Sequence, residues 1–140
     1  MGQRLRQATA DDLPRIHAIR RGVSENRLTD PSLVTAAEVD WYLREAIFLV
    51  SEDEDDIQGF VCANPLTGYL WALFVIDGAQ GRGHGSALID AALALLREAG
   101  HRQAFLTTDP DTRAERFYRA RGWQRTGLDM RGEAVLRMGL

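Results

Sequence analysis

The fold of this chain is decided by the stretch Gln80-Gly81-Arg82-Gly83-His84-Gly85. An apolar run at residues 69–76 precedes it, and this run is aromatic and β-branched enough to predict a buried strand. The run that follows, at 86–97, is rich in strong helix formers and predicts a long helix. Glycines let an anion approach the backbone, and the first turn of a helix has unpaired N–H groups and partial positive charge. The pattern of strand, glycine turn and helix therefore predicts a binding site for a diphosphate.

Length and composition predict a single globular domain over residues 1–140. The chain is 45% hydrophobic, which suits one sizeable core, and it contains one cysteine, so no disulfide forms within it. Its net charge of -3 gives no general attraction to nucleic acid or to an anionic membrane. No apolar segment has the length of a signal peptide or of a membrane span, so we expect a cytoplasmic protein.

Lysine is absent from the chain, and all 17 basic residues are arginine. This composition excludes enzymes that form a Schiff base through lysine, Ser-Lys dyads and nucleotide-binding loops of the Walker type.

The other elements follow from hydrophobic periodicity and from helix caps. In chain order they are a strand at 4–8, a helix between Thr9 and Gly22, a helix at 36–45, strands at 47–50 and 57–63, then, beyond the central helix, a strand at 103–108, a helix at 113–121 and strands at 123–126 and 134–138. A strand, a helix and a second strand with a short return favour parallel pairing with a right-handed crossover. The order β-α-α-β-β-β-α-β-α-β-β predicts an α/β fold with a mixed sheet, antiparallel early and parallel around the central helix.

Five consecutive carboxylates at residues 52–56 raise the question of a metal site. The run lacks the alternating ligand spacing and the distal glutamate of a calcium loop, so we interpret it as a solvated hairpin tip. The histidines and the cysteine show no ligand spacing either. We therefore expect no metal.

Two motifs in this order resemble the Gcn5-related N-acetyltransferase (GNAT) family. Gln80-x-x-Gly83-x-Gly85 matches the family's Gln/Arg-x-x-Gly-x-Gly/Ala signature for acetyl-CoA. The segment 111–123 resembles the family's Asn-x-x-Ala-x-x-Phe-Tyr-x-x-x-Gly-Phe pattern, with Phe117 and Tyr118 at its aromatic pair. The resemblance implies a mixed central sheet with helices on both faces and acetyl-CoA as co-substrate.

The family's cofactor contacts carry over position by position. Main-chain N–H groups of the glycine turn would bind the diphosphate, and the strand before it, which splays from its neighbour in the family, would bind the pantetheine arm. The residues so assigned are Leu73, Phe74, Val75, Gln80, Gly81, Arg82, Gly83, His84, Gly85, Ser86 and Asp111. Asp111 stands where the family often has Asn, and an ionised carboxylate cannot donate a hydrogen bond. Thr112 could replace that contact, and Asp111 could instead cap the helix.

For catalysis, the resemblance implies that Tyr118 is the general acid for the leaving thiolate, although a core role is its alternative. Phe117 is expected only to pack. Tyr69 and Leu106 occupy positions where some members have a glutamate base, and neither can take a proton in that role. The base must therefore come from elsewhere or from ordered water. The resemblance implies that the loop after the first helix borders the acceptor site, so our first choice of base is Glu25, and the weaker candidates are His17, Asp40 and Asp77. The residues proposed to shape the acceptor pocket are Glu25, Asn26, Arg27, Trp41 and Trp71, for which core or surface roles remain open.

These observations predict an acetyl-CoA-dependent N-acetyltransferase that moves the acetyl group directly to an amine. Negative charge at Glu25, Glu38 and Asp40 favours a cationic small molecule as acceptor over a protein. A non-catalytic acyl-CoA-binding sensor is the alternative, while the glycine spacing argues against a Rossmann-type dinucleotide site. The resemblance also allows a homodimer, with Trp123 and the last strand facing a partner chain.

Overall fold

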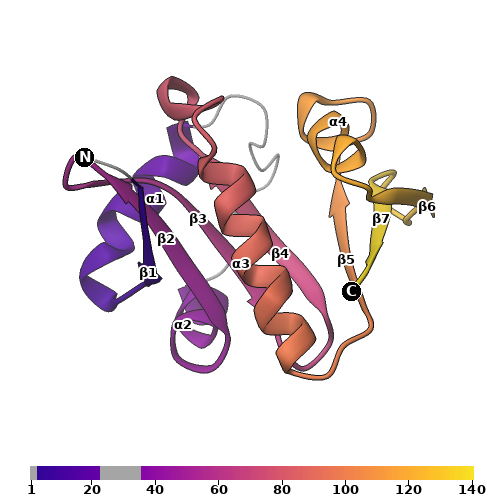
Figure 1. The fold of residues 1–140 in the computed structure, drawn as a ribbon, viewed down its shortest axis with the longest axis horizontal. Helices are drawn as coiled ribbons and strands as arrows, with labels where there is room; N and C mark the ends of the chain where they lie inside the picture. The colour runs from indigo at the N-terminus through magenta and orange to yellow at the C-terminus, as the bar shows by residue number, and fades with distance from the viewer. Residues whose placement is uncertain (1–2, 23–35) are drawn as a thin grey trace.

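Seven strands form one mixed sheet in the order β1-β2-β3-β4-β5-β7-β6 (Figure 1). The computed structural model describes residues 3–22 and 36–140. The strands are β1 (Arg4–Gln7), β2 (Ile47–Asp53), β3 (Asp56–Asn64), β4 (Tyr69–Val75), β5 (Gln103–Thr108), β6 (Gln124–Leu128) and β7 (Ala134–Gly139). The helices are α1 (Leu13–Gly22), α2 (Ala36–Glu45), α3 (His84–Glu98) and α4 (Arg113–Ala120), with short 3-10 turns η1 (Ala10–Asp12) and η3 (Asp77–Ala79).

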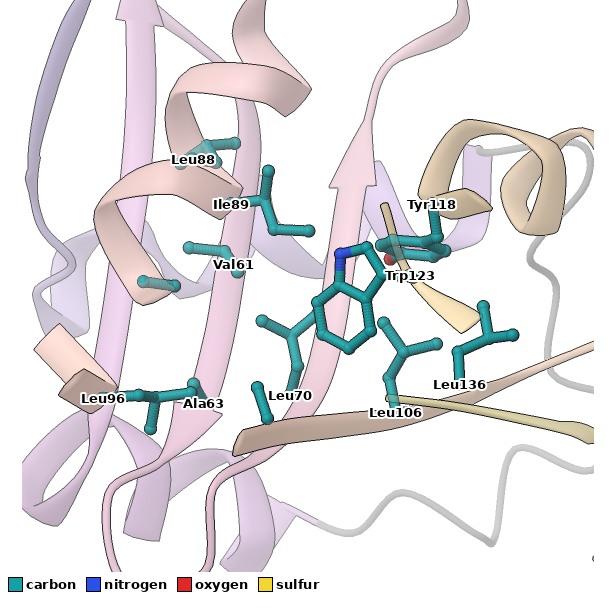
Figure 2. Close-up of a cluster of buried hydrophobic side chains, with 12 residues drawn as sticks. Val61, Ala63, Leu70, Leu88, Ile89, Leu96, Leu106, Tyr118, Trp123 and Leu136 are labelled. Atoms are coloured by element: carbon teal, nitrogen blue, oxygen red, sulfur yellow. The ribbon is translucent and has the colours of Figure 1, made fainter. Parts of the chain in front are cut away.

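Helices cover both faces of the sheet because the side chains of its central strands alternate between two apolar cores. On one face, Leu88 and Ile89 of α3 pack with Val61 of β3 in a cluster to which Tyr118 and Trp123 also belong (Figure 2). On the other face, α1 and α2 pack against Phe60 and its neighbours on β2 and β3. The predicted order of elements and the mixed sheet are confirmed.

The two edges of β4 differ. Toward β3, β4 is paired from Tyr69 opposite Asn64 to Val75 opposite Gly59, with one register shift between Cys62 and Ala63. Toward β5 it runs parallel and has the single residue pair Tyr69–Phe105. Beyond this pair the strands diverge, and β5, β7 and β6 are set apart with α4 on one side of the molecule (Figure 1). The splayed strand implied by the family resemblance is therefore present.

The acidic run forms the tip of the β2–β3 hairpin, as expected, but the turn is tighter than the predicted loop of residues 51–56. The strands continue to Asp53 and resume at Asp56, so only Glu54 and Asp55 make the connection. Both have positive φ (56° and 65°), the backbone geometry of a two-residue hairpin turn.

The expected partner-facing role of Trp123 is wrong. Its side chain is buried in the core with Tyr118 and Leu136, so it presents no surface to another chain. The last strand, β7, lies inside the sheet between β5 and β6, so β6 is the edge strand.

Candidate functional site

A cavity of about 490 Å³ opens where β4 and β5 diverge. One wall is formed by β4, the glycine turn and the start of α3, through Leu73, Val75, Ala79, Gln80, Gly81, Gly83, His84, Gly85 and Ser86. The other wall is α4, through Arg113, Ala114, Phe117 and Tyr118. The two motifs singled out in the sequence thus face each other across one cavity.

The glycine turn presents backbone N–H groups to this cavity. Gly81 and Gly83 have φ of 84° and 88°, in the left-handed region that disfavours side chains with a Cβ. Gly83 is the N-cap of α3, and no side chain caps the helix there. The first-turn N–H groups are therefore free of the usual capping oxygen, and the partial positive charge of the helix end is suited to an anion.

Gln80 holds the turn to the end of β4. Its side-chain Nε2 donates a hydrogen bond to the Val75 carbonyl at 3.2 Å. Its Oε1 is buried and has no hydrogen-bond partner among the described residues. A buried acceptor without a donor is unfavourable unless a ligand or water satisfies it, so this wall is suited to a polar ligand.

The His84 side chain points away from the cavity, toward β2. Its Nδ1 lies 2.6 Å from the Ser51 hydroxyl oxygen, and its Nε2 lies 3.9 Å from a carboxylate oxygen of Asp53. Burial lowers the pKa of the imidazole despite the nearby carboxylate. His84 therefore contributes its backbone to the turn, and its neutral side chain fixes the start of α3 against the sheet.

Tyr118 lies both in the core cluster and on the cavity wall. Its ring contacts Trp123 edge-on, with centroids 5.7 Å apart (Figure 2). Burial raises the pKa of the phenol well above its usual value, so the hydroxyl keeps its proton at neutral pH. Phe117 packs next to Gly85 and also lines the cavity.

A buried ionic network holds the N-terminal end of α4. Glu115 is 2% exposed and accepts hydrogen bonds from Arg125 of β6 (Nε–Oε2, 2.7 Å) and from the backbone N–H of Asp111 (2.7 Å). The Arg125 guanidinium lowers the pKa of Glu115 to about 2, against a usual value of 4.5. The helix is capped by Thr112, which accepts from the N–H of Glu115, so the suggestion that Asp111 caps it is wrong.

Several residues assigned from sequence do not line this cavity. The Asp111 carboxylate is exposed and pairs with Arg125 at 3.2 Å. Arg82 is exposed, and the Phe74 ring stacks on Phe60 on the opposite face of the sheet. The backbone groups of Arg82 and Phe74 remain predicted cofactor contacts.

The acceptor and base candidates among the described residues do not line the cavity. Trp41 and Trp71 flank Tyr42 in an aromatic group on the α1 and α2 face, with Tyr42 and Trp71 stacked at 4.3 Å. Asp40 forms an ion pair with Arg44 on α2. Neither His17 nor Asp77 lines the cavity. Glu25, Asn26 and Arg27 fall outside the described residues.

Four residues of the walls were not assigned to the site from the sequence: Ala79, Arg113, Ala114 and Phe117. For α4 a signal was available, because residues 113, 114, 117 and 118 are spaced to share one face of a helix.

Comparison with known proteins identifies the family. Residues 12–123 match the model of the acetyltransferase (GNAT) family, and the chain belongs to this family. In an alignment of 116 positions that covers 76% of the chain, it is 34% identical to a mycothiol acetyltransferase of Sanguibacter keddieii, and the match spans 36% of that relative's length.

Solved structures share the fold. The PaiA N-acetyltransferase of Thermoplasma acidophilum, solved in complex with coenzyme A, aligns over the whole of both chains with a TM-score of 0.79 and 14% identity. An N-acetyltransferase of Staphylococcus aureus Mu50 aligns over 99% of both chains with a TM-score of 0.80 and 18% identity.

Over residues 3–22 and 36–140, no helix is long and apolar enough to cross a bilayer. Within the same residues, no three His, Cys, Asp or Glu side chains are grouped so as to hold a metal ion.

Proposed function

We propose that this chain transfers an acetyl group from acetyl-CoA directly to an amine, with a small molecule as acceptor. The observation that carries the proposal is the single cavity where three features meet: the uncapped, glycine-lined start of α3, the unpaired edge of β4 and the Tyr118 side chain. These three features match the three parts of acetyl-CoA, which are a diphosphate, an extended amide arm and a sulfur atom.

The residues fit the cofactor in the order in which its parts occur. Backbone N–H groups of the turn 81–86 would hold the diphosphate. The open edge of β4 at Leu73 and Val75 would pair with the pantetheine arm as an added strand does, since its backbone groups lack a β5 partner. Bound acetyl-CoA would supply the thioester. A backbone N–H of β4 would donate to the thioester oxygen as negative charge develops on it.

Tyr118 would act as the general acid. Its phenol stays protonated because burial raises its pKa, so it can donate to a sulfur that leaves as thiolate. Donation to sulfur needs the hydroxyl on the cavity side, and Tyr118 lines the cavity. Among the described residues of the cavity wall there is no carboxylate, so Glu25 remains our candidate base.

The small-molecule acceptor is proposed on two grounds. The Sanguibacter relative is named a mycothiol acetyltransferase. The acidic residues Glu38 and Asp40 lie exposed on α2, although Asp40 is partly neutralised by Arg44.

The proposal is tested by titrating the protein with acetyl-CoA in a calorimeter and then measuring free thiol released with a panel of amines. The panel contains cationic, neutral and anionic small amines and a peptide with a free N-terminus. We expect acetyl-CoA to bind and small cationic amines to react fastest. No binding would refute the proposal, whereas reaction with the peptide alone would refute only the acceptor class.

A second candidate, a non-catalytic acyl-CoA sensor, is favoured by the lack of a carboxylate on the described cavity wall. Replacing Tyr118 by Phe separates the two. An enzyme is expected to lose about a hundredfold or more in turnover, the usual contribution of a general acid, while its affinity for CoA changes less than twofold. If wild type binds acetyl-CoA but releases no thiol with any amine, the sensor replaces the enzyme.

A further inference from the structure

Arg121, directly after α4, reaches across to the first turns of α3. Its Nη1 donates a hydrogen bond to the Ser86 hydroxyl at 3.0 Å, and its Nη2 contacts the Asp90 carboxylate. Its guanidinium carbon lies 5.8 Å from the centre of the Phe117 ring. Ser86 and Phe117 both line the cavity, one from each wall. The Arg121 guanidinium therefore lies beside the cavity, next to the turn that would hold the diphosphate.

The ion pair with Asp90 is not enough to explain why the Arg121 guanidinium lies beside the cavity. The side chains of Arg121 and Asp90 are 28% and 64% exposed, and exposed ion pairs contribute little to stability. The placement is also unfavourable by itself, because Ser86 is in the first turn of α3, where the helix end carries partial positive charge. A cation next to that helix end becomes favourable when an anion binds between them.

The charge of the cavity wall is a second reason to assign Arg121 a role in binding an anion. The described residues of its wall include no Asp or Glu, and Arg113 is the basic residue among them. Backbone N–H groups supply only partial charges to a diphosphate, whereas a guanidinium supplies a full one in a planar geometry suited to phosphate oxygens.

We propose that Arg121 is a phosphate-binding residue of the cofactor site and that it exchanges Asp90 for a phosphate of CoA. The inference rests on the proposed use of acetyl-CoA. Asp90 keeps the guanidinium beside Ser86 in the absence of ligand and competes with the ligand for it. Removing Arg121 should therefore weaken binding, and removing the charge of Asp90 should strengthen it.

The test measures dissociation constants for three ligands that carry different numbers of phosphates, of which pantetheine also lacks the adenosine. CoA has a diphosphate and a 3′-phosphate, dephospho-CoA has the diphosphate alone, and pantetheine has none and is measured by competition against CoA. We expect Arg121→Gln to weaken CoA binding about tenfold and Asp90→Asn to tighten it about twofold, with pantetheine unchanged by either. Equal weakening of CoA and dephospho-CoA assigns Arg121 to the diphosphate. Weakening of CoA alone assigns it to the 3′-phosphate.

Three controls separate this role from a structural one. Arg97→Gln removes one positive charge from the exposed far end of α3 and is expected to change CoA binding less than twofold. Arg121→Lys keeps the charge and is expected to recover part of the lost affinity. The melting temperature of each variant without ligand reports any loss of fold.

The inference is overturned if Arg121→Gln leaves CoA affinity within twofold, if it weakens pantetheine as much as CoA, or if Asp90→Asn weakens CoA binding. Failure of the wild type to bind CoA would instead refute the proposed function.

Discussion

The two edges of β4 differ in pairing, and the difference shows how one strand can hold the sheet together and still leave backbone groups unpaired. Toward β3, six residue pairs fix β4 in register. Toward β5 there is one pair, Tyr69–Phe105, supported by a hydrogen bond of 3.1 Å from the Phe105 N–H to the Gly68 carbonyl. The paired edge is part of the continuous sheet beneath α3, whereas the open edge leaves backbone groups available at the cavity.

An open edge has to be compensated, since β5, β7 and β6 are joined to the other strands of the sheet only through this short contact. Among the described residues, contacts between α4 and the start of α3 provide this compensation. Phe117 packs on Gly85, and Arg121 bonds to Ser86, so α4 is held to the start of α3. The same contacts join the two walls of the cavity. We therefore expect mutations at the paired edge to change mainly stability, and mutations at the open edge to change mainly binding.

The largest expected effect is at the paired edge. A Cβ on Gly59 would lie 2.6 Å from the Phe74 carbonyl oxygen and 3.3 Å from Leu88, so β3 would have to move away from β4 or α3. We expect Gly59→Ala to lower the free energy of unfolding by about 3 kcal/mol, measured by urea denaturation, because tightly packed sites tolerate added atoms poorly.

The control for Gly59 is Gly127→Ala on the edge strand β6, where a Cβ would meet no atom within 4 Å. Its expected effect is below about 0.5 kcal/mol. Equal destabilisation by the two substitutions would show that close packing at the β3–β4 edge is not the cause of the loss of stability.

The second largest effect is expected at the Glu115–Arg125 ion pair, which joins α4 to β6. Glu115 contributes stability because its folded-state pKa, about 2, lies below the usual 4.5. This contribution is fully present above pH 4.5 and is lost as the pH falls toward 2. Replacing Glu115 by Gln should lower the free energy of unfolding by about 2 kcal/mol at pH 7, since Arg125 loses its buried partner, and by less at pH 3.5.

Urea denaturation at pH 7, 5 and 3.5 checks this prediction. Glu98→Gln, at the exposed end of α3, serves as the control and is expected to follow the wild type at every pH. A Glu115→Gln variant with the same pH dependence as the wild type would contradict the assigned role of the ion pair.

The sequence predicted most of what depends on neighbouring residues. The helix at 36–45 and the strand at 103–108 have the bounds of α2 and β5, because periodicity and caps are local. Helix α3 begins two residues before the predicted start, at His84, because Gly83 takes the left-handed conformation as its N-cap. The glycine turn was predicted because its glycines have a backbone role.

Contacts between distant residues could not be predicted. Arg121 and Ser86 are 35 residues apart, and His84 and Ser51 are 33 apart. Each joins two elements whose separation depends on the whole sheet, and a polar side chain has many surface alternatives. The direction of the His84 side chain was hidden for the same reason, since the turn alone does not say which residue faces β2.

The smallest effect sharpens the comparison at the open edge. Gly83 has φ of 88° and space for a Cβ, whose nearest neighbour would be a flexible Gln3 side chain at 3.6 Å. Alanine there meets no packing clash, unlike at Gly59, and its cost is the left-handed backbone, about 1 kcal/mol. Rotation of the backbone to relieve that strain turns the N–H groups at the start of α3, so we expect Gly83→Ala to weaken CoA binding about fivefold.

The matched control is Gly78→Ala in η3, where no atom lies within 4 Å of a Cβ and no positive φ is needed. Equal affinities of the two variants, measured by calorimetry, would mean that the conformation of Gly83 does not set the direction of the N–H groups toward the phosphate.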